Sequence, residues 1–245
     1  MAYQFAKGYP KGEFLLPSVT KIIGDFSDKS KVRALTQWSA NQVVAWVKLN
    51  CAKTKGSFPY YRVSDEQLNR ARFNFRDVSD TALEVGSAVH KAAEEYLNIG
   101  KKIETDNAQI KSGFNAFLEW LYKNKVEPIT VEETVYGNYW AGTLDLRCWL
   151  RMKGWKERKQ YVIDFKTSKT LQKIDMGPQI AAYRSVFPDV QGNGILRLDK
   201  ETGLNEWWDA SGQYEKDLKV FNKMVELYML RHKIIANKAG WKEEA

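Results

Sequence analysis

Apolar and polar positions repeat with two different periods along this chain of 245 residues. Between residues 84 and 123 the apolar side chains recur every three or four positions, as they do on amphipathic helices. From residue 130 they alternate with polar side chains at a period of two, which is typical of half-buried strands. The pattern predicts helices over residues 84–97 and 108–123, then strands over 130–136, 139–150 and 159–167.

The rest of the chain continues this alternation of helices and strands. The sequence predicts a helix over residues 178–187, strands over 194–198 and 206–208, and a long helix over 214–235. Elements in this order indicate a layered α/β core.

The first third of the chain is helical with breaks. A loop over residues 53–62 is marked by Gly56 and Pro59, which interrupt regular structure. We therefore expect a mostly helical N-terminal extension over residues 1–80 and an α/β core over residues 81–245. The helices predicted in the extension span residues 17–23, 30–49 and 65–75.

The positive charge is concentrated in that extension. The whole chain has 38 Lys and Arg against 30 Asp and Glu, and a pI near 9.2. Residues 1–80 hold 13 basic against 7 acidic side chains, whereas the other 165 residues hold 25 against 23. This asymmetry favours a surface for a polyanion, although a solvated lysine-rich helical face would give the same count.

Other features exclude whole classes of protein. No apolar run approaches the roughly 18 residues of a membrane span, and the N-terminus lacks the apolar stretch of a signal peptide. Cys51 and Cys148 are too few for a four-cysteine zinc site or an iron–sulfur cluster. We expect no membrane association and a place in the cytoplasm of a bacterial, archaeal or phage-infected cell, with an organellar matrix as the alternative.

The hairpin of the second and third predicted strands brings acidic residues together. A turn centred between Gly154 and Trp155 pairs residues whose numbers sum to 309, as those of Asp145 and Asp164 do. Opposite residues on one face of a hairpin have Cβ atoms about 5 Å apart. Lys166 lies two residues beyond Asp164 and shares its face.

Two close carboxylates repel each other, and a divalent cation relieves that repulsion. A nearby lysine can orient an attacking water or stabilise negative charge on a phosphate. The alternative is an ordinary exposed sheet face with one salt bridge, since surface Asp–Lys pairs are common.

Three further residues are candidates because of their spacing on helices. His90 follows Gly86 by one turn, so that no side chain covers the approach to its imidazole. Gln179 and Tyr183 are also one turn apart and share a helix face. The alternatives are a histidine at the edge of the core, and ordinary helix packing for the other pair.

These residues occur in a familiar order: GSAVH (86–90), EETVYGNYWAGTLD (132–145), VIDFKTSK (162–169) and PQIAAY (178–183). The order resembles that of the RecB-like branch of the PD-(D/E)XK nuclease superfamily. Together with LPSVTKII (16–23), it is most similar to the exonucleases of mitochondrial genome maintenance and related phage exonucleases. The resemblance implies a restriction-endonuclease-like α/β core, with a mixed central sheet flanked by helices.

The resemblance also implies roles for individual residues. His90, Asp145 and Asp164 would ligate Mg²⁺ or Mn²⁺ together with the main-chain carbonyl of Phe165, and Lys166 would be the catalytic lysine. Asp145, Asp164 and Lys166 would thus form the catalytic set.

Further residues would act around this set. Gln179 and Tyr183 would organise the site or contact the substrate strand. Glu132 matches an acidic position of the family, but Glu133 is its neighbour, and strand alternation lets only one of them face the metal.

The implied activity is metal-dependent hydrolysis of DNA phosphodiester bonds by an exonuclease that prefers single strands with free ends, in replication, repair or recombination. One alternative is a structure-selective or flap endonuclease on the same fold. Another is a non-catalytic DNA-binding module or recombination partner, which would have no use for an anionic pocket. Replication or recombination proteins are the expected protein partners, and no iron–sulfur cluster is expected.

The segment over residues 55–76 interleaves aromatic with cationic side chains, a composition that suits single strands. We expect this segment, with the helix over 30–49, to form an arch over the active site. Packing of the aromatic rings onto the core is the alternative. The expected strand contacts are Tyr60, Tyr61, Arg70, Arg72 and Arg76.

Overall fold

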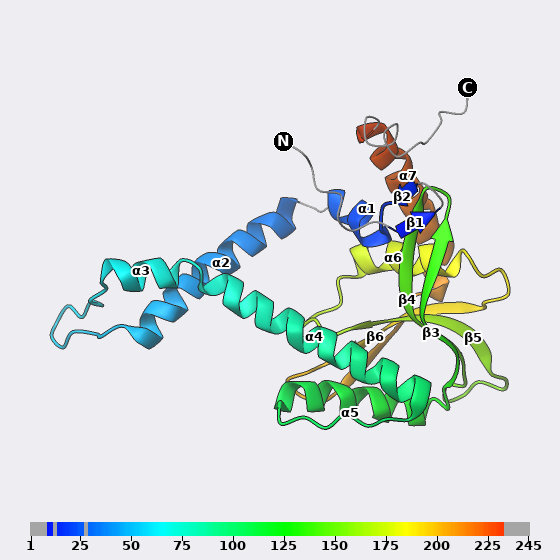
Figure 1. Ribbon diagram of the computed structural model, residues 1–245, viewed down its shortest axis with the longest axis horizontal. Coiled ribbons are helices and arrows are strands. Elements are labelled where there is room, and N and C mark those ends of the chain that lie inside the picture. The colour runs from blue at the N-terminus through cyan, green and yellow to red at the C-terminus, as the bar shows by residue number, and fades with distance from the viewer. Residues whose placement is uncertain (1–8, 12–13, 27–28, 233–245) are drawn as a thin grey trace. The chain divides into compact units, whose positions relative to one another are not determined.

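The computed structural model describes residues 9–11, 14–26 and 29–232 (Figure 1). Within this part, the chain divides into two compact units. The sheet unit contains the described residues up to Phe26 and those from Ala88 onward. The helical unit contains the described residues of Ser27–Ser87. None of the described helices combines the length and the apolar character that crossing a membrane requires.

A five-stranded mixed sheet organises the sheet unit, in the order β3-β4-β5-β6-β7. Neighbouring strands are antiparallel except for β5 and β6, which are parallel. The predicted mixed α/β architecture is therefore confirmed. The strands are β3 (Glu127–Gly137), β4 (Trp140–Leu150), β5 (Lys159–Lys166), β6 (Gly192–Leu198) and β7 (Asn205–Asp209).

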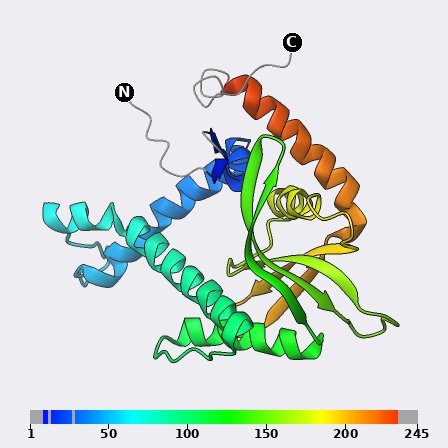
Figure 2. The same ribbon diagram turned by 45° about the vertical axis from the view of Figure 1, so that its right-hand side comes forward.

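Helices cover both faces of the sheet, as Figures 1 and 2 show. On one face α1 (Val19–Asp25), α6 (Lys173–Arg184) and α7 (Tyr214–Arg231) bury an apolar cluster that includes Ile180 and Phe221. A 3-10 turn, Ser211–Gln213, leads into α7.

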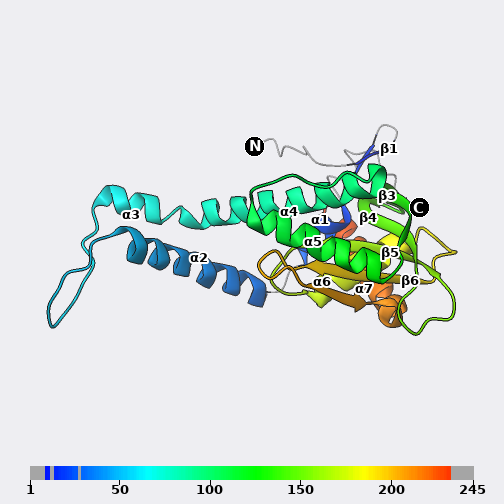
Figure 3. The ribbon, with the colours of Figure 1, turned by 90° about the horizontal axis from the view of Figure 1, so that it is seen from below.

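On the other face, α5 (Ala108–Lys123) packs beside the second half of α4 (Asn74–Ile99), as Figure 3 shows from below. Aromatic rings fill this cluster: Phe117 meets Phe165 of β5 edge to face, with 5.5 Å between ring centres. The active-site candidates on β4 and β5 therefore lie between two hydrophobic layers.

The chain begins with elements that belong to the sheet unit and not to the helical unit. Strands β1 (Tyr9–Lys11) and β2 (Phe14–Leu16) pair with each other, and Ser18 caps α1 by accepting a hydrogen bond from the amide of Lys21. Val19 and Ile22 of α1 are completely buried in the sheet unit. The division therefore differs from the predicted boundary at residue 80, because burial of α1 ties the start of the chain to the sheet.

The helical unit consists of α2 (Lys29–Asn50), α3 (Asp65–Ala71) and the first half of α4. Ser64 begins α3 with a capping box, in which its hydroxyl accepts from the amide of Gln67 and the Gln67 side chain accepts from the amide of Ser64.

The helix predicted over residues 65–75 ends at Ala71, and the starts of two other helices differ from the predicted ones by five residues or more. Helix α4 begins at Asn74, ten residues before the predicted start, and α6 begins at Lys173 with Pro178 inside it. Proline removes one helical hydrogen bond, but every residue from Met176 to Tyr183 is buried. Packing of α6 against the sheet thus outweighs the local preference for a break.

Candidate active site

The strands β4 and β5 pair with the predicted register and then separate. Arg147 faces Val162 and Leu146 faces Ile163, so the pairing sum of 309 is confirmed. The pairing of β4 with β5 ends at Leu146 and Ile163. From there towards its N-terminus β4 pairs with β3 alone, and from there towards its C-terminus β5 pairs with β6 alone. Asp145 and Asp164 are the next residues on each strand, so both lie at this fork in the sheet.

The Asp145 carboxylate links two elements at the fork. One oxygen accepts a hydrogen bond from the main-chain amide of Phe165, and the other lies 3.4 Å from Nδ1 of His90 on α4. The side chain thus replaces the hydrogen bond that the strand backbone would otherwise make to β5. His90 also meets the ring of Phe165 edge to face, with 6.0 Å between ring centres.

Asp164 is held from two sides and is 3% exposed. Its Oδ1 accepts a hydrogen bond of 3.0 Å from the Gln179 amide, and Nζ of Lys166 lies 2.5 Å from its Oδ2. The Lys166 side chain is 25% exposed, whereas the Asp164 side chain beneath it is buried.

The structure distinguishes between the two neighbouring glutamates of β3. Glu133 faces away from the fork, where it accepts hydrogen bonds from Thr130 and from Arg147 at 3.3 Å. Glu132 has a positive φ of 51°, a left-handed conformation that is uncommon outside glycine. Glu132 lies at the fork with His90 and Asp145, so Glu132 and not Glu133 is the glutamate that faces these two residues.

His90, Glu132 and Asp145 each offer one ligand atom, and these atoms all lie within 4.8 Å of one another. Mg²⁺ takes ligands at about 2.0–2.1 Å, so opposite ligands in an octahedral site are about 4 Å apart. The three side chains thus fit one divalent cation after a small contraction.

This set differs in part from the predicted ligands. His90 and Asp145 belong to both sets, whereas Glu132 replaces Asp164 in the compact group, because Lys166 and Gln179 already engage Asp164. The predicted role of the Phe165 carbonyl stays a prediction. The contact described for this residue is its amide, which donates to Asp145.

Burial and neighbouring charges together shift the pKa values at the fork. Glu132 is exposed in part, but the desolvation of its buried part, then the charges of Asp145 and Glu94, raise its pKa to about 7. Burial also raises the pKa of Asp164 to about 6, against the opposing charge of Lys166.

The pKa values of the two basic side chains at the fork are raised as well. Burial alone would lower the pKa values of Lys166 and His90, but hydrogen bonding and charge from Asp164 and Asp145 raise both above their ordinary values. Neighbouring carboxylates thus contribute to all four upward shifts, in addition to burial in the case of the two acids.

Glu94 is the site residue that the sequence reasoning missed. It lies one turn after His90 on α4, and its charge helps to raise the pKa of Glu132. The spacing of four residues from His90 could have indicated it, since such residues share a helix face.

The residues that were predicted to contact a DNA strand all lie in the helical unit, but their surroundings differ. Nη2 of Arg70 lies 2.7 Å from Oε1 of Glu66, so its charge is already paired. The guanidinium groups of Arg72 and Arg76 lie 4.7 Å and 4.9 Å from the ring centre of Phe73, which is 40% exposed.

Tyr60 and Tyr61 lie on a loop whose two ends are joined by a backbone hydrogen bond and by a contact between a lysine and a ring. The amide of Thr54 donates to the carbonyl of Tyr60 at 2.8 Å, and Nζ of Lys53 lies 6.0 Å from the ring centre of Tyr61. Tyr60 is 59% exposed and Phe58, near the tip of the loop, is 92% exposed. The loop thus presents aromatic rings and lysines to solvent.

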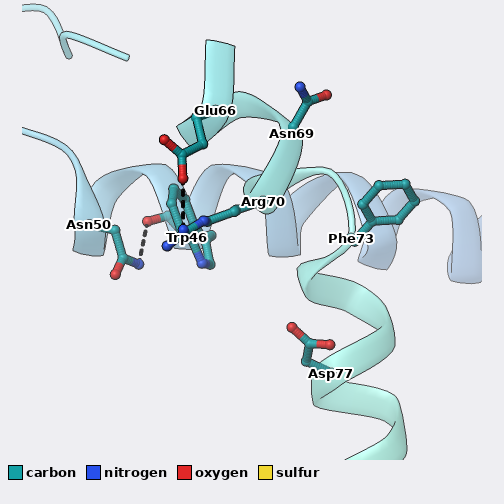
Figure 4. Close-up of a pocket in the computed structure, with 7 residues that line it drawn as sticks. All are labelled: Trp46, Asn50, Glu66, Asn69, Arg70, Phe73 and Asp77. Carbon is teal, nitrogen blue, oxygen red and sulfur yellow. Dashed lines mark hydrogen bonds and ion pairs between the residues drawn. The ribbon is translucent and has the colours of Figure 1, made fainter. Parts of the chain in front are cut away.

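A hollow of about 910 Å³ opens in the helical unit (Figure 4). Its arginine is paired with Glu66, and Asp77 adds a second acid, so this hollow does not favour a phosphate. The lining residues are Trp46, Asn50, Glu66, Asn69, Arg70, Phe73 and Asp77.

Comparison with known proteins leaves the family open. No protein-family model and no curated protein matches this chain. Among solved structures, the crystal structure of SSO0001 is similar at 12% sequence identity, covering 56% of this chain and 84% of that chain. Its TM-score of 0.26 is too low to carry an argument about fold or function.

Proposed function

We propose that this chain is a metal-dependent DNA exonuclease with a PD-(D/E)XK core, acting on single strands that have free ends. One observation carries the proposal: a buried aspartate–lysine pair, Asp164 and Lys166, stands beside a group of three metal-ligating side chains at a fork in the sheet. A protein that only bound DNA would gain nothing from carboxylates facing a polyanion. The order of motifs along the sequence supports the same function.

The residues of the fork have separable tasks in such a reaction. His90, Glu132 and Asp145 would hold Mg²⁺ or Mn²⁺. A bound cation of this kind lowers the pKa of water and neutralises phosphate charge. In hydrolysis the water oxygen bonds to phosphorus, the bond from phosphorus to the leaving oxygen breaks, and that oxygen takes up a proton.

Lys166 would position the reacting groups. Asp164 keeps its ammonium charged and fixed from beneath, while the exposed side of the lysine can donate hydrogen bonds to the attacking water or a phosphate oxygen. Gln179 would keep the Asp164 carboxylate in place through its 3.0 Å hydrogen bond.

The preference for single strands rests on the helical unit. Residues 29–64 contain seven Lys and Arg and no Asp or Glu. Phe58 and Tyr60 are exposed within this acid-free stretch. Cations for phosphates beside open rings for unstacked bases are the usual composition of single-strand surfaces.

The experiment compares linear and circular single-stranded DNA of equal length, incubated with Mg²⁺ or Mn²⁺. We expect loss of the linear substrate alone, abolished in Asp164→Asn and retained in the control Asp189→Asn, whose carboxylate lies on the exposed turn after α6. Cleavage of both substrates would instead support a structure-selective or flap endonuclease. Binding without cleavage of either would support a non-catalytic recombination partner.

A further inference from the structure

Gly142 and Tyr183 touch each other across two elements of the sheet unit. Gly142 lies on β4, three residues before Asp145, and Tyr183 lies on α6. A Cβ atom at Gly142 would lie 2.6 Å from Cε1 of Tyr183 and 3.0 Å from its hydroxyl oxygen. Carbon atoms in contact are normally about 3.5–4.0 Å apart. The tyrosine ring therefore occupies space that any side chain at position 142 would need.

The tyrosine in turn contacts the residue that holds Asp164. Its hydroxyl oxygen accepts a hydrogen bond of 3.4 Å from Nε2 of Gln179, and the same nitrogen donates to Oδ1 of Asp164 at 3.0 Å. Tyr183 is 3% and Gln179 7% exposed, so water does not compete for these bonds. An amide nitrogen has two hydrogens, and these two partners together use both.

Helix α6 itself is tightly seated, which makes this chain of contacts stiff. A Cβ atom at Gly177 would lie 2.5 Å from Oδ2 of Asp217 on α7. The backbone of α6 at Gly177 is therefore in close contact with the Asp217 side chain. Every residue of α6 between these contacts is buried. The position of the Tyr183 ring on β4 therefore fixes where α6 presents Gln179.

We propose that Gly142 and Tyr183 are positioning residues that set the Asp164 carboxylate through the amide of Gln179. This inference rests on the proposed function, because Asp164 and Lys166 are the pair being positioned. Residues of three separate sequence motifs then act together. Gly142 on β4 leaves space for the ring of Tyr183, and the Tyr183 hydroxyl orients the side-chain amide of Gln179. That amide in turn holds the Asp164 carboxylate. Neither Gly142 nor Tyr183 needs to touch DNA or metal.

A purely structural role would have different consequences. If Tyr183 only filled the core, changes at Gly142 would lower thermal stability and leave the site of the folded protein unchanged. A matched control exists on β6: a Cβ atom at Gly192 would lie 2.1 Å from Cζ of Tyr161, a similar contact between a glycine and a ring. The hydroxyl of Tyr161 bonds to Asp209 and not to the fork.

The experiment measures Mn²⁺ affinity by calorimetry without DNA, together with kcat and KM on linear single strands. We expect Gly142→Ala to leave Mn²⁺ affinity unchanged, because the group of His90, Glu132 and Asp145 that would hold the metal does not include Asp164. We expect its kcat to fall about 10–100-fold at unchanged KM, because small misplacements are costly in catalysis. Gly192→Ala should lower thermal stability but leave kcat unchanged.

Two further variants test the route through the tyrosine. Tyr183→Phe keeps the ring and removes the hydroxyl, so its kcat should fall several-fold while the melting temperature hardly changes. In a Tyr183→Leu background the space beside Gly142 is free, and Gly142→Ala should then change kcat less than about twofold, because the two changes act on one contact.

The outcomes separate this inference from the function beneath it. If the wild type binds Mn²⁺ and degrades DNA but Gly142→Ala and Tyr183→Phe match it, the positioning role is refuted and the proposed function stands. An equal loss from Gly142→Ala with and without Tyr183 would also refute it. A wild type that binds Mn²⁺ but cuts no DNA would overturn the proposed function, and the position of the Asp164 carboxylate in crystal structures of Gly142→Ala and Gly192→Ala would still decide the positioning role.

Discussion

Charged side chains are held in opposite ways in the two units of this protein. At the fork of the sheet unit, Asp164 is 3% exposed and meets Lys166 at 2.5 Å. In the helical unit, the pair of Glu66 and Arg70 is as close, at 2.7 Å, but its side chains are 76% and 70% exposed. Similar distances thus occur in very different surroundings.

The difference lies in what water can do. Water screens an exposed ion pair, so that it contributes little to stability and fixes little geometry. A buried pair cannot be solvated, and removing one partner leaves a costly charge behind. The side chains at the fork therefore have fixed orientations and shifted pKa values. The helical unit instead presents exposed positive charge that any polyanion can use.

The largest expected effect breaks the buried pair. Lys166→Met should reduce hydrolysis by about 10²-fold or more, because a preorganised donor at the reacting phosphate is lost. It should also lower the free energy of unfolding by about 2 kcal/mol, less than the roughly 3–5 kcal/mol of fully buried pairs because Lys166 is 25% exposed. Nuclease assays and urea unfolding at pH 8 measure the two effects.

Two controls connect this prediction to the comparison. Asp164→Asn combined with Lys166→Met removes both charges, and it should restore stability without restoring hydrolysis. Arg70→Met, which breaks the exposed pair, should change the free energy of unfolding by no more than about 0.5 kcal/mol. Equal losses of stability from Lys166→Met and Arg70→Met would show that burial does not distinguish the two pairs.

The fork was only partly predictable from the sequence. A hairpin pairs residues at a constant sum, so the turn near Gly154 was sufficient to predict the register as far as Leu146 and Ile163, the residues next to Asp145 and Asp164. The predicted pairing of the two aspartates themselves is not observed, because the strands separate there. The separation of β4 from β5 was not predictable, because it depends on the competing pairings with β3 and β6. The left-handed backbone at Glu132 also has no local sequence signal, since glutamate disfavours it.

The prediction of some helix boundaries was wrong for a related reason. Pro178 suggested the start of a helix, yet α6 extends five residues further towards the N-terminus, because its buried residues gain more from packing than the proline costs. Helix α5 was predicted from residue 108 to residue 123, as observed, because Asn107 caps it and its apolar positions repeat regularly. Local signals therefore predicted the elements that need few distant contacts.

A smaller effect concerns the pH dependence of stability without metal. Glu132 and Asp164 have pKa values raised to about 7 and about 6, from ordinary values of 4.5 and 3.8. The folded protein therefore binds more protons than the unfolded chain between about pH 4 and pH 7, and its stability falls as pH rises through this range. The raised pKa of His90 extends the fall in the same direction, since protonation stabilises the fold.

Thermal unfolding in EDTA between pH 5 and pH 8 measures this dependence. We expect the melting temperature to drop by a few degrees over that range, and Mn²⁺ to reverse the drop because it binds the ionised carboxylates. Glu132→Gln should flatten the EDTA profile and weaken the effect of Mn²⁺, whereas Glu133→Gln should not flatten it. A melting temperature that rises with pH in EDTA would contradict the raised pKa values of Glu132 and Asp164.

The smallest expected effect belongs to the exposed arginines. Arg72→Ala with Arg76→Ala should weaken binding of a single-stranded oligonucleotide to Asp164→Asn protein, and should reduce the slope of log affinity against log salt by roughly 1.4, or about 0.7 for each phosphate contact. Arg70→Ala should change the slope less, because Glu66 already balances its charge. Fluorescence anisotropy at several salt concentrations measures both slopes. If Arg70→Ala had the larger effect, DNA would have to displace Glu66 from its partner, and the exposed pair would be a part of the binding surface that opens only for the strand.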